Sequence, residues 1–203
     1  MKKIIVKTIE CRLCYSKKLF PFLNLGNIPI RNAELRKNSK VVVPNLKILV
    51  CKDCWHVQAG KVPLPKFYVK DYTYHTRFSK TVDDHFKKRA KQIIKKFSLN
   101  SKNLVMDIGG NDGTFLKNFK INNKAIQKLC VDPTFKTTYF AKKLGIKIYR
   151  DFFNLKNSKI IKKKYGSPKI ILCTNTFGAI NNMNEFVSGL NKVMDEKSVF
   201  IYE

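Results

Sequence analysis

The sequence has few acidic residues and very little arginine. Only 14 of its 203 residues are Asp or Glu, against 41 Lys or Arg, so the formal net charge is +27. Six of the 41 basic residues are Arg and the other 35 are Lys. Because Arg is the side chain suited to bidentate contacts with phosphates and bases, its scarcity argues against a nucleic-acid-binding protein. We interpret the charge as mainly a solvated Lys-rich surface, which could also draw in a phosphate-bearing substrate.

The sequence also lacks a long apolar run. Runs such as residues 41–43 and 170–173 are far shorter than the roughly 20 residues needed to cross a bilayer. The first apolar stretch is interrupted by Lys7, so it cannot serve as the core of a signal peptide. We therefore expect a cytoplasmic protein with no membrane partner. The hydrophobic fraction of 44%, with 15 Phe and 8 Tyr, is sufficient for a folded core.

Four of the six cysteines form two CxxC pairs separated by 36 residues. They are Cys11, Cys14, Cys51 and Cys54. Two such pairs can place four thiolates tetrahedrally around one zinc ion, in a structural site without an open coordination position. The alternatives are two disulfides or a redox pair, but disulfides do not suit a chain without an export signal. Cys130 and Cys173 lie in hydrophobic runs and are interpreted as buried, inert thiols.

Three segments are predicted along the chain. Residues 1–66 form a small zinc-ribbon-like module, and residues 67–100 form an aromatic connector followed by an amphipathic helix over 78–97 with Ser79 as its N-cap. From residue 101 to 203, apolar strands alternate with helices, which predicts an α/β, Rossmann-like domain with a parallel sheet of about five strands. The expected strands are 104–108, 128–131, 147–149, 170–174 and 199–202, and the expected helices are 114–119, 137–144, part of 155–165, and 184–193.

A glycine-rich turn follows the first expected strand of this domain. Residues 107–114 read DIGGNDGT, and Asn111 stands where many such loops have a second glycine. Asn tolerates left-handed geometry, so this replacement is physically mild. Asp107 and Asp112 would repel a pyrophosphate, but they suit a cationic ligand with an amino-acid end, such as S-adenosylmethionine.

Polar residues also follow the next strands. Asp132 lies 19 positions after Gly113, where a carboxylate can accept bonds from both ribose hydroxyls of a nucleoside; alternatively it starts an ordinary turn before Pro133. Asp151 and Phe152 could bond the amino group of an adenine and cover its ring. Asn175 ends the fourth strand on the side of the sheet where ligands bind.

These motifs together resemble a known family. They are CRLC at 11–14, LGNIPI at 25–30, CKDCWHVQ at 51–58, YTY at 72–74, DIGGNDGT at 107–114, VDP at 131–133, DFF at 151–153 and NTF at 175–177. In order and spacing they are similar to the S-adenosylmethionine-dependent C-methyltransferases of nucleotide-linked deoxysugars that carry an N-terminal zinc-binding domain. The resemblance covers essentially the whole chain.

The resemblance implies a reaction and a set of contacts. A base removes a proton from a sugar carbon beside a keto group, and the enolate attacks the methyl group; Tyr72 or Tyr74 would lie near the reacting centre. The zinc module and the connector would help form the side of the cleft that binds the nucleotide sugar. Cofactor contacts are implied for Asp107, Gly109, Asn111, Asp112, Gly113, Asp132, Asp151, Phe152 and Asn175, and zinc contacts for Cys11, Cys14, Cys51 and Cys54.

The sequence departs from the family pattern in two places. Ala179 stands where the family often has a His shortly after the Asn of the fourth strand. The family's chains also run on for about as long again, whereas this one ends with the strand at 199–202, which we expect to be an exposed apolar edge. We therefore expect a fragment, a split gene product or a decayed copy that is competent at most for cofactor binding, and a partner chain could supply the missing lobe. The alternatives are a non-catalytic remnant and a zinc-containing, basic nucleic-acid-binding protein.

Overall fold

The computed structural model describes residues 5–29, 43–65, 69, 72–121 and 124–203. Contacts divide the chain into two units, Met1–Thr73 and Tyr74–Glu203. The boundary falls in the expected connector, part of which lies outside the described residues, as does Ile30 of the second motif. The division into segments at 66 and 100 therefore stays a prediction. Among the described residues, no helix is long and apolar enough to cross a membrane.

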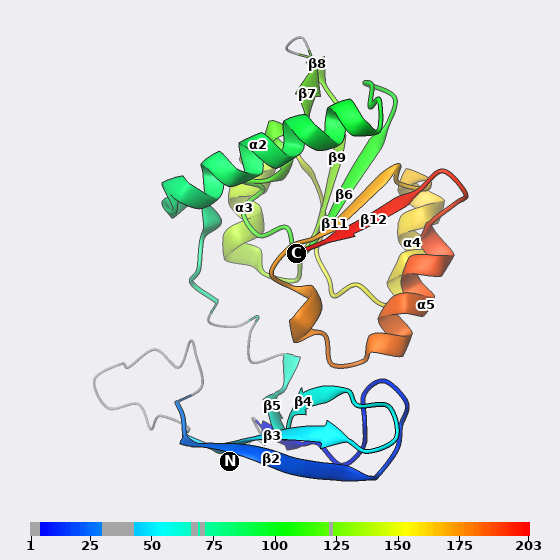
Figure 1. The fold of residues 1–203 in the computed structure, drawn as a ribbon. Helices are drawn as coiled ribbons and strands as arrows, with labels where there is room; N and C mark the ends of the chain where they lie inside the picture. The colour runs from blue at the N-terminus through cyan, green and yellow to red at the C-terminus, as the bar shows by residue number, and fades with distance from the viewer. Residues whose placement is uncertain (1–4, 30–42, 66–68, 70–71, 122–123) are drawn as a thin grey trace. The chain divides into compact units, whose positions relative to one another are not determined.

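The first unit is a small antiparallel β structure. β1 (Ile5–Lys7) pairs with β5 (Lys61–Pro63), and a separate sheet has the order β2 (Leu19–Asn27), β3 (Asn45–Cys51), β4 (Val57–Ala59). Each CxxC pair lies at a turn of this structure, the first between β1 and β2 and the second between β3 and β4 (Figure 1). Among the described residues of this unit, the buried hydrophobic side chains are those of Cys11 and Cys51. The unit therefore depends on the cysteine cluster rather than on an apolar core.

The second unit contains a five-stranded parallel sheet, which confirms the predicted α/β class. Its strand order is β10-β9-β6-β11-β12, and each neighbouring pair is parallel. The strands are β6 (Leu104–Ile108), β9 (Gln127–Val131), β10 (Lys147–Tyr149), β11 (Ile170–Cys173) and β12 (Val199–Tyr202). All five expected strands are present within one residue of their predicted bounds, and all their carboxyl ends meet at one edge of the sheet.

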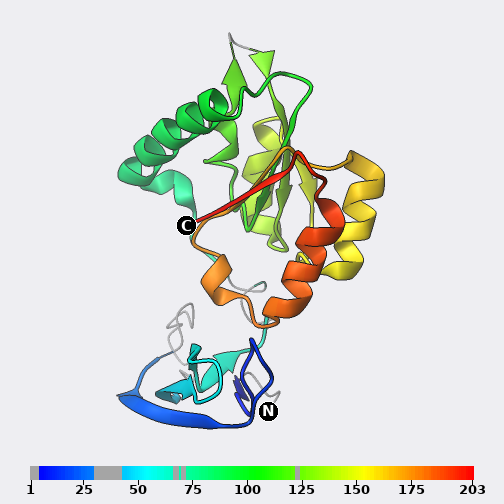
Figure 2. The same ribbon diagram turned by 45° about the vertical axis from the view of Figure 1, so that its right-hand side comes forward.

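Helices cover both faces of this sheet. The helices are α2 (Lys80–Lys96), α3 (Phe135–Lys143), α4 (Leu155–Tyr165) and α5 (Met183–Val193). α2 and α3 lie on one face and α4 and α5 on the other, as Figures 1 and 2 show. Alternate residues of each strand supply the two cores: Val105 packs on the side of α2, and Met106 packs on the side of α4 and α5. α2 begins as predicted, with the Oγ of Ser79 accepting a hydrogen bond from the amide of Val82 at 3.3 Å.

The predicted helix over 114–119 is wrong. The chain there makes only a short 3-10 turn, η2 (Leu116–Asn118). Phe115 and Phe119 are both buried, and their rings lie 5.6 Å apart, so the chain turns into the core instead of running along its surface. A short hairpin that the sequence did not predict follows, with β7 (Lys120–Ile121) paired to β8 (Lys124–Ala125). Two further 3-10 turns are η1 (Thr76–Phe78) and η3 (Phe177–Ala179).

Candidate metal centre and cofactor site

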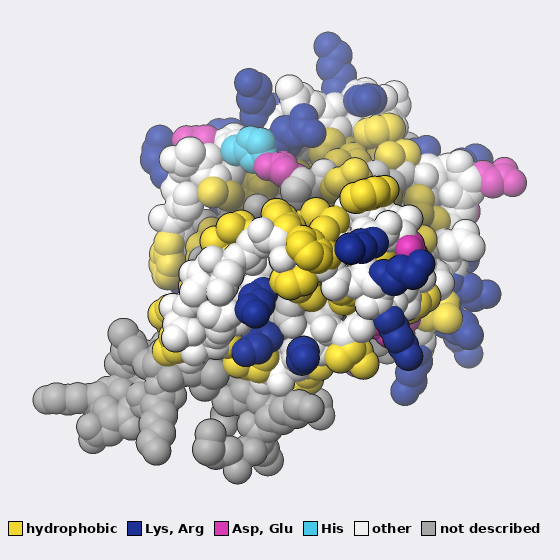
Figure 3. All heavy atoms as spheres, turned by 60° about the horizontal axis from the view of Figure 1, so that its bottom comes forward, with side chains coloured by type: hydrophobic (Ala, Val, Ile, Leu, Met, Phe, Trp, Pro, Cys, Tyr) yellow, Lys and Arg dark blue, Asp and Glu magenta, His cyan; other side chains and the backbone are white. Residues whose placement is uncertain are grey.

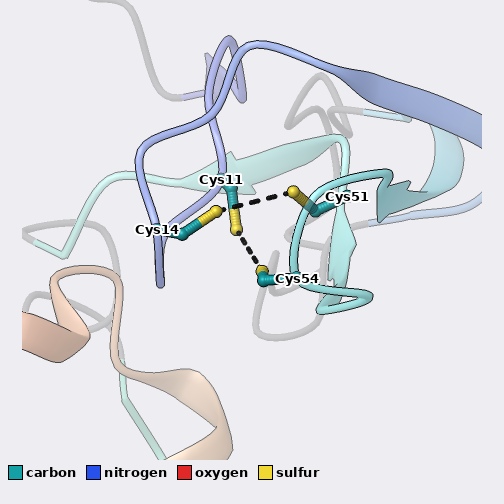
Figure 4. A group of neighbouring side chains, drawn as sticks. All are labelled: Cys11, Cys14, Cys51 and Cys54. Carbon is teal, nitrogen blue, oxygen red and sulfur yellow. Dashed lines mark hydrogen bonds between the residues drawn. The ribbon is translucent and has the colours of Figure 1, made fainter.

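The four cysteines of the two CxxC pairs converge in the first unit. Their sulfur atoms all lie within 4.8 Å of one another, with Cys11 Sγ 3.5 Å from Cys54 Sγ and Cys14 Sγ 3.6 Å from Cys51 Sγ (Figure 4). A tetrahedral zinc ion with Zn–S bonds of about 2.3 Å requires sulfurs about 3.8 Å apart. The cluster therefore has the dimensions of a zinc site with four cysteine ligands, and the structure brings the four predicted ligands together.

The backbone around both pairs follows the same pattern. The amide of Tyr15 donates to the carbonyl of Cys11 at 2.9 Å, and the amide of Trp55 donates to the carbonyl of Cys51 at 2.9 Å. Tyr15 and Trp55 both have φ of 62°. Each pair is thus followed directly by a left-handed residue, whose amide closes the turn onto the carbonyl of the first cysteine. Two like turns that face one another explain why four thiols meet at one point.

The protonation of these thiols is uneven. Burial raises the pKa of Cys51, but hydrogen bonds from the Cys54 and Asp53 amides and from Cys14 outweigh it and lower the pKa to about 6. For Cys54, the amide of His56 lowers the pKa, but burial and the other three thiols outweigh it and raise the pKa to about 12. Thiolates this close repel one another, so full deprotonation requires a cation among them. Soft thiolate ligands in a tetrahedral set fit zinc.

Gln58 supports the metal centre, and the sequence analysis gave it no role. Its side chain is buried, accepts a hydrogen bond from the amide of Arg12 at 2.9 Å, and donates one to the carbonyl of Glu10 at 3.0 Å. It thereby ties the first CxxC turn to β4, just beyond the second. The sequence carries no signal for this role, because it depends on the burial of the Gln58 amide between an exposed Val57 and a half-buried Ala59.

The second candidate site lies at the carboxyl edge of the parallel sheet. β6 ends in Asp107 and Ile108, and Asp132 directly follows β9. Asp151 follows β10, and Asn175 follows β11. The parallel strands therefore place the polar residues predicted for the cofactor along one edge.

The glycines of the loop are packed against protein groups. Gly109 has φ of +76°, and a Cβ there would come within 2.2 Å of the Thr176 Oγ1. Gly113 has φ of +78°, and a Cβ there would meet the side chains of Ile146 at 2.5 Å and Ala141 at 3.0 Å. Both glycines thus permit the turn, as expected, and also let the loop pack closely on the η3 segment and on α3. The sequence analysis did not identify Thr176 as the residue that covers Gly109.

Asp132 makes hydrogen bonds within the protein. One carboxylate oxygen accepts from the amide of Asn111 at 3.0 Å, and the other accepts from the amide and hydroxyl of Thr134. Asp132 is 6% exposed, and burial is the main cause that raises its pKa. These bonds fit the alternative of a turn-forming Asp before Pro133. Its contact with a ribose stays a prediction.

Asp107 carries the strongest electrostatic perturbation of the site. Its side chain is 2% exposed, and burial together with the charge of Asp132 raises its pKa to about 7. Its Oδ1 has no hydrogen-bond partner within the described part of the chain. A buried carboxyl with an unused oxygen and a second carboxylate nearby favours a bound cation.

The other predicted contacts are more exposed. The Oδ1 of Asp151 accepts from the amide of Phe152 at 2.7 Å, and the Phe152 side chain is 37% exposed. Asn175 has φ of 53°, and its amide donates to the carbonyl of Glu203 at 2.8 Å. Tyr72 lies in the first unit, whereas Tyr74 lies in the second and is 41% exposed. Roles for these residues stay predictions.

Comparisons with known proteins match the first unit to a zinc-binding family and the whole chain to a C-methyltransferase. Residues 11–66 match the family described as "Putative zinc binding domain". The chain is 21% identical over 207 residues to the C-methyltransferase NovU of Streptomyces niveus, and the match covers 100% of this chain and 49% of NovU. The chain therefore spans about half the length of this curated relative.

Solved structures of methyltransferases are also similar to the chain. One is the plantazolicin methyltransferase BpumL in complex with a pentazolic desmethylPZN analog and SAH, at 17% identity and a TM-score of 0.48, covering 62% of this chain and 48% of that one. Another is an S-adenosylmethionine-dependent methyltransferase from Clostridium acetobutylicum, at 12% identity and a TM-score of 0.45, covering 58% of this chain and 48% of that one.

The comparisons confirm the resemblance predicted from the sequence. The chain is similar to a C-methyltransferase along its whole length, and its first unit matches a zinc-binding family where the four cysteines converge. The match to a zinc-binding family, at the place where the four thiols meet, supports the zinc expected from the sequence. S-adenosylmethionine, the other expected cofactor, is named for the Clostridium acetobutylicum methyltransferase, and BpumL was solved with SAH.

Proposed function

We propose that the chain is the zinc-binding and cofactor-binding part of a C-methyltransferase that uses S-adenosylmethionine and acts on a nucleotide-linked keto-deoxysugar. The match with NovU along the whole chain supports the reaction class. Because the chain spans about half of NovU, we further propose that a second polypeptide segment completes the substrate side. None of the cysteines in the described chain forms a disulfide, and a reducing cytoplasm would keep the four ligand thiols available for zinc.

The distribution of acidic residues is the observation that carries this proposal. The chain has a net charge of +27 and only 14 acidic residues. Four of these lie at the carboxyl edge of the sheet, Asp107 within β6 and Asp112, Asp132 and Asp151 in the loops that follow the strands, and the first three are buried. Burying carboxylates costs free energy unless they have partners. Asp112 and Asp132 accept hydrogen bonds within the protein, whereas the Oδ1 of Asp107 has no such partner in the described part of the chain. A cationic ligand such as S-adenosylmethionine would provide that partner, whereas a pyrophosphate would be repelled.

The residues of the chain would divide the work of binding and orientation. S-adenosylmethionine, when bound, supplies a methyl group activated by a positively charged sulfur. Asp107 and Asp112 would hold the positive groups by charge, and the exposed ring of Phe152 would cover an adenine. Tyr74, which is 41% exposed, would face the sugar and stabilise the enolate oxygen that forms when a base of the completing segment accepts the proton from the carbon beside the ketone. Fixing the nucleophilic carbon in line with the methyl group would provide much of the rate gain.

Calorimetry with the zinc-loaded chain tests the cofactor part of this proposal. We expect S-adenosylmethionine to bind with one site per chain and Asp107→Asn to weaken binding at least tenfold. Asp84→Asn is a matched control because Asp84 is exposed and pairs with Lys80 on α2, away from the carboxyl edge. A chain that fails to bind S-adenosylmethionine but binds RNA with a steep salt dependence would instead support the nucleic-acid alternative.

Methyl transfer tests the substrate part. We expect the chain alone to transfer no methyl group to a nucleotide-linked keto-deoxysugar. Turnover should appear when a polypeptide corresponding to the other half of NovU is added. Robust turnover by the chain alone would overturn the proposed need for a second segment.

A further inference from the structure

The glycine-rich loop makes an unexpected set of contacts with the segment that opens the second unit. The Nδ2 of Asn111 donates to the carbonyl of Tyr74 at 3.0 Å, and the Oδ1 of Asn111 accepts from the amide of Thr76 at 3.3 Å. The next loop residue continues the pattern, because the Oδ2 of Asp112 accepts from the amide of Arg77 at 3.0 Å. Two adjacent loop side chains thus bind three positions of the backbone within residues 74–77.

These contacts explain why Asn stands at position 111. Asn111 has φ of 50°, a conformation that glycine adopts at lower cost, yet its side chain is buried. A glycine would allow the same turn but could make neither of the two bonds to Tyr74 and Thr76. The Oδ1 of Asn111 also accepts from the backbone amide of Asp112 at 2.8 Å, so one side-chain oxygen joins the loop to Thr76. The position therefore needs a side chain that accepts left-handed geometry and has both a donor and an acceptor.

The side chains of the segment reinforce its attachment. The guanidinium of Arg77 lies 3.4 Å from the centre of the Phe140 ring on α3. The ring of His75 meets the edge of the same ring at 5.2 Å, and its Nδ1 lies 3.8 Å from the Oδ2 of Asp112. The segment is thus held between the loop and α3. Both of these elements also border the proposed cofactor site.

We infer that Asn111 and Asp112 form a clasp that fixes residues 74–77 against the cofactor loop and thereby positions Tyr74. Asn111 is then a positioning residue and makes its contribution through Tyr74. Because the chain enters the second unit at Tyr74, the clasp also links cofactor occupancy to the end of the connector from the zinc unit. Cofactor bound on the loop would restrict the movement of the loop, tighten the clasp and slow the opening of residues 74–77. This coupling rests on the proposed function, whereas the clasp itself does not.

Amide hydrogen exchange of the zinc-loaded chain without cofactor tests the clasp. The amides of Thr76 and Arg77 should be protected, and Asn111→Gly should speed the exchange of the Thr76 amide at least tenfold while leaving the amides of β6 and β9 protected. Asn103→Gly is the matched control, since it removes a side-chain acceptor from a turn at the opposite end of β6, where Asn103 binds the amide of Asn100 at 2.8 Å. Unchanged exchange at residues 74–77 in Asn111→Gly would overturn the clasp.

A second arm adds S-adenosylmethionine and tests the coupling. In the wild-type chain, saturation should slow exchange at Thr76 and Arg77 at least fivefold, and Asn111→Gly should abolish this slowing. When the chain is combined with a polypeptide corresponding to the other half of NovU, Asn111→Gly should lower kcat more than it raises KM for S-adenosylmethionine. Binding without any slowing would overturn the coupling. Absence of binding by the wild-type chain would overturn the proposed function and the coupling with it, while the first arm still decides the clasp.

Discussion

At the scale of single residues, the stability and the ligand affinity of the second unit depend on closely packed residues at the carboxyl edge of the sheet. Gly109 has no room for a side chain because Thr176 occupies the space, and the Asp107 side chain is almost fully shielded from solvent. Each of these constraints has a measurable consequence. One concerns stability and the other concerns pH.

Gly109→Ala should destabilise the second unit strongly. The new methyl group would lie 2.2 Å from the Thr176 Oγ1, at a φ of +76°. The left-handed backbone costs about 1–2 kcal/mol and the overpacking about 1–3 kcal/mol, so we expect a loss of roughly 2–5 kcal/mol in the free energy of unfolding. Urea denaturation measures it. Gly145→Ala is the control, because Gly145 has φ of +71° with nothing within 4 Å, and should lose only about 1–2 kcal/mol. Equal losses in the two variants would contradict the packing argument.

The affinity for S-adenosylmethionine should rise with pH and level off above pH 7. Burial and the charge of Asp132 raise the pKa of Asp107 to about 7 in the free protein, so below that pH its carboxyl is protonated. A cation that binds the carboxylate must displace this proton, and affinity therefore falls as pH decreases. Calorimetry at a series of pH values on both sides of about 7 measures the trend. Asp107→Asn should bind weakly with a flatter pH profile; an unchanged slope would assign the titration to another group.

At the scale of elements, the sheet and most of its helices could be predicted from the sequence because mostly apolar strands alternate with amphipathic segments. β6 and β11, for example, are buried at every position, as central parallel strands are. The prediction of a helix over 114–119 was wrong because Phe115 and Phe119 fill the core and do not form the buried face of a helix. Their spacing of four suits a helical face, but both rings belong to the core beneath α2.

The contacts that the sequence could not predict join residues far apart in the chain. Asn111 lies 37 positions from Tyr74, and Gln58 lies 48 positions from Glu10. Such hydrogen bonds leave no periodic signal, because they depend on how the strands and turns meet in three dimensions. The cysteine ligands were predictable despite a similar separation, since metal chemistry constrains both the residue type and the spacing. The cofactor contacts expected at the carboxyl edge also come from sequence motifs, and they remain predictions.

Removal of zinc should unfold the strands of the first unit and leave the parallel sheet intact. The described first unit buries little apolar surface beyond Cys11 and Cys51, so metal binding, worth roughly 10 kcal/mol or more, would supply most of its folding free energy. A chelator should increase amide exchange in β1 to β5 but not in β6 and β9. Cys14→Ser should act like the chelator, and Cys173→Ser, in β11, should not release the metal. Retained protection in β3 after complete zinc removal would contradict this prediction.

At the scale of the whole molecule, charge is the dominant property. Figure 3 shows many Lys and Arg side chains and few Asp or Glu side chains on the face that it draws, with hydrophobic side chains among them. The chain has 41 basic and only 14 acidic residues, so most of the positive charges cannot each be paired with a carboxylate. Self-repulsion of this kind lowers the stability of the folded state.

Added sodium chloride should therefore raise the stability of the zinc-loaded chain. At an ionic strength of about 0.1 M the screening length is about 10 Å, which weakens repulsion between separate surface lysines more than attraction in close pairs. If this screening raises the free energy of unfolding by about 1 kcal/mol, the Tm should rise by about 2–4 °C. Calorimetric scans between low and moderate salt measure it. A Tm that falls with salt would show that ion pairs such as Lys117–Asp83, at 2.7 Å, outweigh the repulsion.

Trp55 gives the molecule an optical property of its own. It is the single tryptophan of the chain, follows Cys54 directly, and has 74% of its surface exposed. Its intrinsic fluorescence therefore arises from one defined position, beside the metal ligands and outside the unit that holds the parallel sheet. Emission intensity and anisotropy should report zinc loading of the first unit alone. When this tryptophan is excited selectively, its emission can be used to follow zinc binding during a titration of the metal site.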